Sequence, residues 1–149
     1  MRKPHQILAF PYKIENGKIM YAIFKRSDKQ GTWQGIAGGV EDNESYIEAC
    51  KREANEEANI SYKAKVVELE SICTIPVTKV TKEFIWGDDV CLVHEHCFGI
   101  DATDESIEIS TEHADFKWCN YEDAQKLLRY DSNKNALWEL NYKLNKKKE

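Results

Sequence analysis

Short runs of apolar residues, separated by polar turns, fill the first quarter of the chain in a pattern typical of β-strands. Residues 6–14 and 18–25 form two such runs. Asn16-Gly17 between them is the preferred pair for a tight hairpin turn, because both residues tolerate a positive φ. The pattern therefore predicts a β-hairpin, followed by a polar loop over 26–35.

The next segment has a helical composition. After a short apolar piece that ends in Gly38-Gly39, residues 43–58 are rich in Glu, Ala, Lys and Arg and contain neither Gly nor Pro. Asn43 is expected to be the N-cap, because its side chain can accept hydrogen bonds from the first free backbone N–H groups. We therefore predict a helix from Asn43 to about Ala58.

The rest of the chain alternates between strand-like and helical segments. Strands are predicted over 60–77, 90–100 and 116–119, with an exposed polar connection over 78–89, and helices over 121–129 and 133–144. Asp131 or Ser132 is expected to cap the last helix. No linker or repeat divides the sequence, so we expect one domain over 1–149. The order of elements indicates an α/β (α+β) fold, with a mixed β-sheet sandwiched between α-helices.

Composition excludes several classes of protein. With 149 residues, 42% of them hydrophobic and 32% charged, the chain can bury a core and is not of the disordered type. Its apolar runs fall far short of the ~20 residues of a membrane helix, and nothing near the N-terminus resembles a signal peptide. The five cysteines form no Cys-x-x-Cys pair, which favours a reduced, cytoplasmic compartment over a disulfide or zinc framework.

The negative charge is concentrated in one segment. The net charge is −5, and residues 41–57 contain seven acids but only two bases, whereas the other acids and bases balance at 19 each. A net acidic chain is a poor non-specific ligand for nucleic acid. Neither a nucleic acid nor a membrane is therefore expected as a partner.

Three acids of this segment share one side of the predicted helix. At ~100° per residue, Glu53, Glu56 and Glu57 fall on one arc, and the adjoining arc carries small or apolar residues that can pack on a sheet: Ile47, Cys50, Ala54 and Ala58. Like charges at this spacing repel and destabilise a helix by a few tenths of a kcal/mol per pair. Solvent alone can offset this, but a hard divalent cation, Mg²⁺ or Mn²⁺, would do so better.

The flanking residues strengthen the metal interpretation. Gly38 and Gly39 come just before the helix, where a glycine lets the backbone approach a bound ion or phosphate. Arg52 can form a charge-assisted hydrogen bond to Glu44 or Glu48, which would leave the other acids free.

The spacing of these residues matches a known motif. The segment reads Gly38, five residues, Glu44, seven residues, Arg52-Glu53-Ala54-Asn55-Glu56-Glu57-Ala58-Asn59-Ile60. It resembles the Nudix box, with Asn59 where the box has its second Gly. Asn is the next best residue for the left-handed conformation that ends the helix there. The fold expected from this resemblance is the Nudix fold.

The resemblance implies hydrolysis of a nucleoside diphosphate linked to another moiety, with Mg²⁺ or Mn²⁺ as cofactor. Glu53, Glu56, Glu57 and the Gly38 carbonyl would be metal ligands, and Arg52 with Glu44 would orient the helix. The general base is left open between Glu53 and Glu112, and Glu112 is also a candidate late metal ligand. Glu95 is a weaker candidate base.

Other polar residues are candidates for binding substrate. Lys25 and Arg26 at a strand end can meet phosphates, as can the backbone at Gly39. Trp33 is either a stacking platform for a pterin or purine ring or an apolar plug, and Asn133 either reads a base edge or caps a helix. His94 and His96 share a strand face, but the sequence offers no third metal ligand.

Further short motifs point to a subfamily. They are Lys25-Arg26-Ser27-Asp28, Trp33-Gln34, Thr111-Glu112-His113, Phe116-Lys117-Trp118 and Ser132-Asn133. Together they resemble the branch of Nudix hydrolases that converts dihydroneopterin triphosphate or dATP to the monophosphate and pyrophosphate. Two alternatives stay open: an ADP-ribose hydrolase, suggested by Pro76 beyond the box, and a non-catalytic nucleotide sensor. Whether the chain forms a homodimer is also left open.

Overall fold

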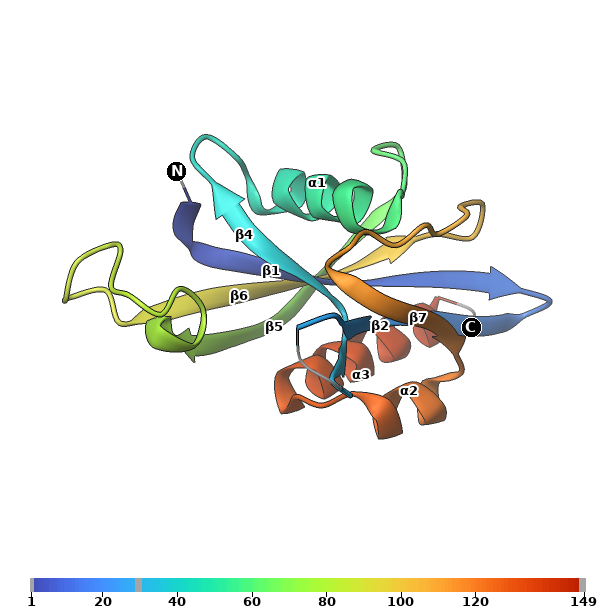
Figure 1. Ribbon diagram of the computed structural model, residues 1–149. Coiled ribbons are helices and arrows are strands. Elements are labelled where there is room, and N and C mark those ends of the chain that lie inside the picture. The colour runs from blue at the N-terminus through green and yellow to red at the C-terminus, as the bar shows by residue number, and fades with distance from the viewer. Residues whose placement is uncertain (1, 29–30, 148–149) are drawn as a thin grey trace.

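The computed structural model describes residues 2–28 and 31–147, in which one mixed sheet lies between helices (Figure 1). The strands are β1 (Arg2–Glu15), β2 (Lys18–Arg26), β3 (Trp33–Gln34), β4 (Ile36–Glu41), β5 (Val66–Pro76), β6 (Leu92–Asp101) and β7 (His113–Cys119). The helices are α1 (Tyr46–Ala58), α2 (Tyr121–Leu127) and α3 (Asp131–Lys146), with a 3₁₀ turn, η1, at Val77–Lys79. None of these helices is long and apolar enough to span a membrane.

The long strand β1 holds the sheet together by changing partners. The strand order is β3-β2-β1-β6-β5, with β4 also paired to β1 and β7 to β2. The first part of β1, through Ala9, pairs with β4, whereas Tyr12 to Glu15 pair with β2. Along its other edge β1 runs parallel to β6. β4 and β2 thus pair with the same edge of β1, but with different parts of that strand. The two strands therefore diverge from each other on this side of the sheet.

Helices cover both faces of the sheet: α1 lies on one face, and α2 and α3 lie on the other (Figure 1). Alternate residues of β1 contribute to the two cores, since successive side chains in a strand point to opposite faces. Ile7 belongs to the core beneath α1, together with Ala54 and Phe24. Leu8 belongs to the core beneath α3, together with Leu137. The mixed α+β sandwich expected from the sequence is therefore confirmed.

Several local predictions are also confirmed. Asn16 and Gly17 form the hairpin turn with φ of 52° and 77°, and Glu15 pairs with Lys18. Asn59 ends α1 in the left-handed conformation, at φ 57° and ψ 35°. The predicted apolar arc of α1 is buried at Cys50, Ala54 and Ala58. All five cysteines are free thiols.

The predicted caps of two helices were wrong. Asn43 adopts φ 67° in the preceding turn, and Ser45 is the N-cap of α1. The hydroxyl of Ser45 accepts from the Glu48 backbone, and the Glu48 side chain accepts from the Ser45 backbone. This reciprocal capping box satisfies two free N–H groups, which a single Asn cannot do. Helix α3 begins at Asp131 after Tyr130, with no side-chain cap.

Strand boundaries also differ from the prediction. The run 60–77 becomes a strand only at Val66, because residues 61–64 form a turn in which the Ala64 backbone donates to the Ser61 carbonyl. The short piece Ile36-Ala37 extends through both glycines to Glu41, since β4 pairs with β1 from Ile36 to Gly39 and again, after a shift in register, at Glu41. This extension carries Gly38 and Gly39 into the sheet, next to α1.

Candidate active site

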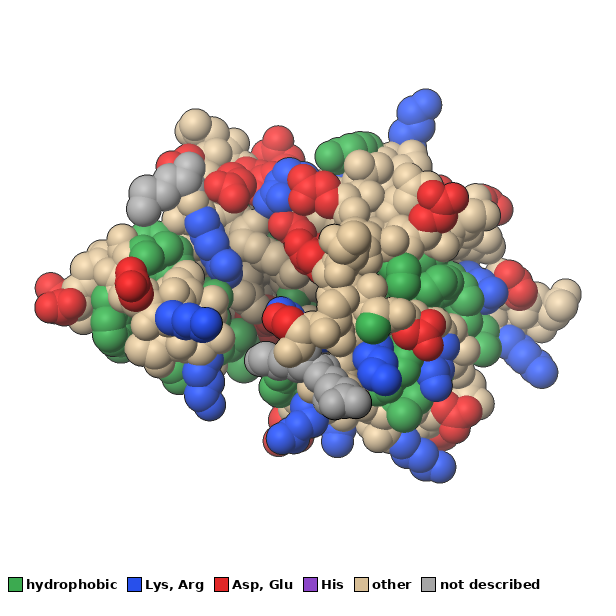
Figure 2. Space-filling model, viewed as in Figure 1, with side chains coloured by type: hydrophobic (Ala, Val, Ile, Leu, Met, Phe, Trp, Pro, Cys, Tyr) green, Lys and Arg blue, Asp and Glu red, His purple; other side chains and the backbone are tan. Residues whose placement is uncertain are grey.

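Helix α1 presents its three predicted acids at different depths. The side chain of Glu57 is 3% exposed and that of Glu53 is 12% exposed, whereas that of Glu56 is 56% exposed. The face is acidic over α1, with a basic side chain among the acids (Figure 2). Two carboxyl groups thus lie inside the protein and the third lies at its surface.

Arg52 fixes the position of α1 against β4. Its guanidinium forms a two-point ion pair with Glu44, at 2.7 Å from Nε to Oε2 and 3.0 Å from Nη2 to Oε1. Nη2 also donates to the Gly39 carbonyl oxygen at 2.8 Å, and Nη1 donates to Glu53 Oε1 at 2.9 Å. Of the two partners proposed from the sequence, Arg52 takes Glu44, because Glu48 is used in the capping box. Arg52 therefore connects α1 to the loop that contains Glu44 and to β4, which contains Gly38 and Gly39.

Replacing this guanidinium tests that role. The Arg52→Lys variant keeps the charge but cannot make the two-point pair, so we expect a loss of about 1–3 kcal/mol in the free energy of unfolding. Loss of a group that orients metal ligands is expected to lower hydrolysis by about 10–100-fold. Urea denaturation and a rate assay measure both effects. The matched control is Arg129→Lys at an exposed position; equal behaviour of the two variants would contradict the assignment.

Glu57 sits in a buried polar cluster. Its Oε1 lies 2.8 Å from Nε2 of His113, which comes from the start of β7, and both side chains are 3% exposed. Burial raises the pKa of Glu57, and the nearby charge of Glu112 raises it further. Burial lowers the pKa of His113, which favours a neutral ring that donates its Nε2 proton. Among the residues that the structure describes, Glu57 Oε2 has no partner.

Glu53 lies directly against Gly38. A Cβ atom added to Gly38 would collide with the Glu53 carboxyl group, so only glycine allows this approach. Burial raises the pKa of Glu53, as does its contact with Glu57, and Arg52 offsets only part of this effect. The two carboxyl groups are thus costly to ionise together unless a cation joins them.

The donor set fits a hard divalent cation. Carboxylate and carbonyl oxygens are its preferred ligands, and within the described residues the buried Oε2 of Glu57 has no hydrogen-bond partner. As the side chains stand, the described residues include no group of three His, Cys, Asp or Glu arranged to hold a metal ion.

A cavity of about 700 Å³ is connected to this cluster through Gly38, which lines the cavity on one side and contacts Glu53 on the other. Gly38 and Ala37 of β4 line it, and Arg26 and Asp28 lie at the end of β2. The inner wall comes from β1, β5 and β6, and the start of α3 contributes Asn133. The volume falls in the ~300–1,000 Å³ range of small-molecule sites.

A sequence model of the NUDIX domain matches residues 12–139 of this chain. The chain belongs to the NUDIX family. A NUDIX hydrolase from Listeria monocytogenes has the same fold, with a TM-score of 0.87, 36% identity and coverage of 97% of both chains. This Nudix domain is therefore a hydrolase of phosphoric anhydride bonds, and the predicted resemblance to the family is confirmed.

Three further matches have more specific names. Dihydroneopterin triphosphate diphosphatase of Escherichia coli is 25% identical over 146 residues, which cover 91% of each protein. The structure of the E. coli dihydroneopterin triphosphate pyrophosphohydrolase superposes with a TM-score of 0.77 at 22% identity, over 94% of this chain and 97% of that one. The NUDIX domain of Shewanella oneidensis NrtR, in complex with ADP ribose, gives a TM-score of 0.69 at 14% identity, with 94% and 87% covered.

The structure brings together only some of the residues predicted for this Nudix site. Arg26 lines the cavity and is held by Asp28 through two hydrogen bonds of 2.6–2.7 Å. Glu112 lies close enough to Glu57 to raise its pKa. The Gly39 carbonyl oxygen accepts a hydrogen bond from Arg52. Glu56 remains at the surface.

Three predicted residues of the substrate site, Gly39, Trp33 and Lys25, do not line the cavity. The ring of Trp33 lies under Nζ of Lys117, 4.8 Å from the ring centroid, and packs against the α3-side core. Its position matches the alternative of an apolar plug. Lys25 is likewise absent from the cavity lining and pairs with Trp33 in the sheet. Asn133 does line the cavity, but its Oδ1 accepts from the Gly35 backbone at 2.9 Å and does not cap α3.

His94 and His96 have different surroundings. His96 stacks on Tyr46 with ring centroids 3.8 Å apart, and its Nε2 meets His5 Nδ1 at 3.2 Å. His94 is exposed. No three ligating side chains converge there in the described part of the chain.

Sequence reasoning missed three residues of the site. His113 was noted only as a neighbour of Glu112, and its contact with Glu57 depends on a pairing across 56 positions. Gln6 and Gln34 are buried polar residues that line the cavity. A glutamine in an otherwise apolar strand was the only available signal for Gln6.

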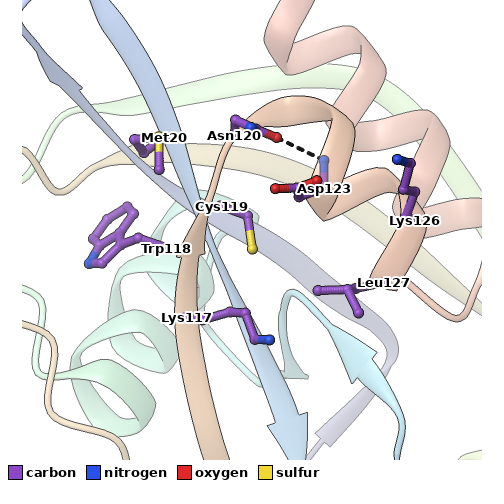
Figure 3. Close-up of a pocket in the computed structure, with 8 residues that line it drawn as sticks. All are labelled: Met20, Lys117, Trp118, Cys119, Asn120, Asp123, Lys126 and Leu127. Atoms are coloured by element: carbon purple, nitrogen blue, oxygen red, sulfur yellow. Dashed lines mark hydrogen bonds between the residues drawn. The ribbon is translucent and has the colours of Figure 1, made fainter.

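A second hollow of about 440 Å³ lies away from the carboxyl cluster, between β7 and α2 (Figure 3). Trp118, Lys117 and Leu127 are among its walls, and the Asn120 side chain caps α2 by accepting from the Asp123 backbone at 2.8 Å. It contains neither a glycine strand nor paired carboxyl groups. The larger cavity, which Gly38 lines, is therefore the candidate Nudix site.

Proposed function

We propose that this Nudix domain is a Mg²⁺-dependent pyrophosphohydrolase that converts a (deoxy)nucleoside or pterin triphosphate to the monophosphate and pyrophosphate. One observation carries the proposal. Two largely buried carboxyl groups with raised pKa values, Glu53 and Glu57, interact with each other, and Glu53 lies against Gly38, which itself lines a nucleotide-sized cavity. Such a site binds a divalent cation and, through it, a polyphosphate.

The residues that would hold the cation are Glu53, Glu57 and the Gly38 carbonyl, with Glu56 and Glu112 as additional ligands. When bound, the cation neutralises the polyphosphate and lowers the pKa of an attacking water. Arg52 holds α1 in register through Glu44 and the Gly39 carbonyl. Arg26 donates to both oxygens of the Asp28 carboxylate, which is the two-point geometry that a phosphate would also use. A bound phosphate would replace Asp28 as the partner of Arg26.

A general base completes the proposed reaction. Glu53 and Glu112 both remain candidates, since the first has a raised pKa and the second lies near Glu57 on an exposed loop. A group whose pKa lies near the working pH accepts a proton most effectively. Glu95 is separated from this cluster by its position on β6, so we assign it no role as base.

The substrate assignment is supported by the E. coli relative named dihydroneopterin triphosphate diphosphatase, to which the match extends over 91% of each chain. The alternative of ADP-ribose hydrolysis has weaker support here, because Pro76 ends β5 before η1, as expected of a strand terminator. A sensor without catalysis would not need the complete set of acids that this chain keeps.

Magnesium is expected to stabilise this protein increasingly as the pH rises. The folded-state pKa values of Glu53 and Glu57 lie above the ordinary value of 4.5. Without metal, these groups therefore favour folding most at or below pH 4.5, and that contribution is lost as the pH rises through their folded pKa values. Because protons and Mg²⁺ compete, the increase in Tm with millimolar Mg²⁺ should be larger at about pH 8 than at about pH 6. Calorimetric scans at both pH values measure this increase, and an increase that shrinks with pH would contradict the site.

A panel of substrates tests the proposed activity. Dihydroneopterin triphosphate, dATP and ADP-ribose are incubated with the protein and Mg²⁺, and the products are separated by chromatography. We expect the triphosphates to be hydrolysed at a higher kcat/KM than ADP-ribose. Conversion of ADP-ribose to AMP and ribose 5-phosphate as the fastest reaction would support the alternative enzyme, and no hydrolysis at all would support the sensor.

A further inference from the structure

Glu95 is a buried carboxyl group that the proposed reaction does not use. It lies on β6 at 3% exposure and lines the same cavity as Gly38 and Arg26. Gln6 Nε2 donates to its Oε2 at 2.6 Å. Within the described chain its other oxygen, Oε1, is buried and has no hydrogen-bond partner. A buried polar atom without a partner is costly, which points to a partner that the protein alone does not supply.

The orientation of this carboxyl group is fixed by a chain of hydrogen bonds. Arg2 Nη2 donates to Gln6 Oε1 at 2.9 Å, so the amide nitrogen of Gln6 faces Glu95. Within the described residues this arrangement leaves one acceptor, Glu95 Oε1, without a partner on a side chain that lines the cavity. Burial raises the pKa of Glu95 and the Gln6 hydrogen bond opposes that shift. A donor that reached Oε1 would favour the carboxylate further.

Glu95 lies at a suitable distance from the phosphate end of the cavity. Gly39, Gln6 and Glu95 are neighbours in one row across β4, β1 and β6. With ~4.8 Å between strands, Glu95 lies on the order of 10 Å from the glycine strand. A substrate whose phosphates bind at Gly38 and Arg26 would therefore extend its ring system along the sheet toward Glu95.

We propose that Glu95 Oε1 accepts an N–H of the 2-amino group of the substrate's ring system and so selects rings with a 2-amino-4-oxo-pyrimidine edge, as in guanine and pterin. This proposal rests on the proposed function and narrows its substrate class. A guanine or pterin edge offers adjacent ring N–H and amino donors to a carboxylate, as Asp and Glu accept from base amino groups elsewhere. Gln6 acts as a positioning residue, because it holds the carboxyl group and leaves only one oxygen available.

Binding of GMP and IMP to the protein in Mg²⁺ buffer tests this selection without turnover. The two ligands differ only in the 2-amino group. We expect the wild-type chain to bind GMP about 10–100-fold more tightly than IMP, the range for a hydrogen bond to a charged group. In Glu95→Gln, Gln6 still donates to the side-chain oxygen, so an amide N–H₂ faces the ligand donors. The GMP preference should then fall to about one, as isothermal titration calorimetry would show.

The matched control is Glu139→Gln. Glu139 is a buried carboxyl group outside the cavity that accepts from the Glu70 and Ser71 backbone. This variant should keep the wild-type GMP preference. Equal binding of GMP and IMP by the wild type, a preference that survives in Glu95→Gln, or no binding of either ligand would overturn the proposal. A GMP preference without triphosphate hydrolysis would contradict the proposed function but support the role of Glu95.

Discussion

The Glu57→Gln variant is expected to hydrolyse its triphosphate substrate about 10²–10³-fold more slowly than the wild-type chain. Glu57 is 3% exposed, with one oxygen on His113 and the other without a partner among the described residues. A neutral amide of the same shape keeps the His113 contact but removes a charge that would bind the cation. Loss of metal binding removes several kcal/mol of stabilisation from the transition state, and each ~1.4 kcal/mol corresponds to a factor of ten in rate. Steady-state release of pyrophosphate measures the effect.

Two further variants serve as comparisons for Glu57→Gln. Glu122→Gln removes a carboxyl group at an exposed position of α2 and should leave the rate unchanged. Glu56→Gln should also lower the rate, but less than Glu57→Gln, since the Glu56 side chain is 56% exposed and contacts Arg52 at 3.3 Å. Undiminished hydrolysis in both Glu56→Gln and Glu57→Gln would show that the metal site has been assigned to the wrong residues.

The Gly38→Ala variant is expected to lose activity by about 10²-fold or more with little loss of stability. The added Cβ would collide with the carboxyl group of Glu53. Because that group is the end of a flexible side chain, it can move away at low cost, but it would then leave the position from which it binds the cation. A displacement of about 1 Å at a reacting site is enough to cost about 10²-fold. Thermal denaturation and the rate assay separate the two effects.

The double variant Gly38→Ala with Glu53→Gln is the control for this mechanism. If the methyl group acts by displacing Glu53, then adding it to Glu53→Gln should cause little further loss, because contacting residues are not additive. If the two substitutions instead lowered the rate by independent factors that multiply in the double variant, the proposed contact would be contradicted. The proposed contact would also be contradicted if the Tm of Gly38→Ala fell so far that unfolding explained its inactivity.

The parts of the fold and of the site that could be predicted depend on local sequence. The hairpin at Asn16-Gly17 and the left-handed end of α1 at Asn59 follow from backbone preferences of single residues. The Arg52–Glu44 pair joins residues eight positions apart within one loop and helix. These features need no knowledge of which strands are neighbours.

The unpredicted parts depend on pairing between distant segments. His113 reaches Glu57 only because β7 pairs with β2, and Gln6 reaches Glu95 only because β1 runs parallel to β6. His94-Glu95-His96 has polar residues at three successive positions, so alternation could not say which face is buried. The prediction that placed Trp33 against a substrate ring could not include Lys117, which covers the indole from β7, on the other side of β2.

The bond that is cleaved tests the central claim most directly. Dihydroneopterin triphosphate is incubated with the wild-type chain, with and without Mg²⁺, and the products are followed by ³¹P magnetic resonance. A site in which the α1 carboxylates and Gly38 hold the cation should give equal amounts of monophosphate and pyrophosphate, and only with Mg²⁺. Release of orthophosphate and a diphosphate, or equal rates with and without the metal, would contradict the account.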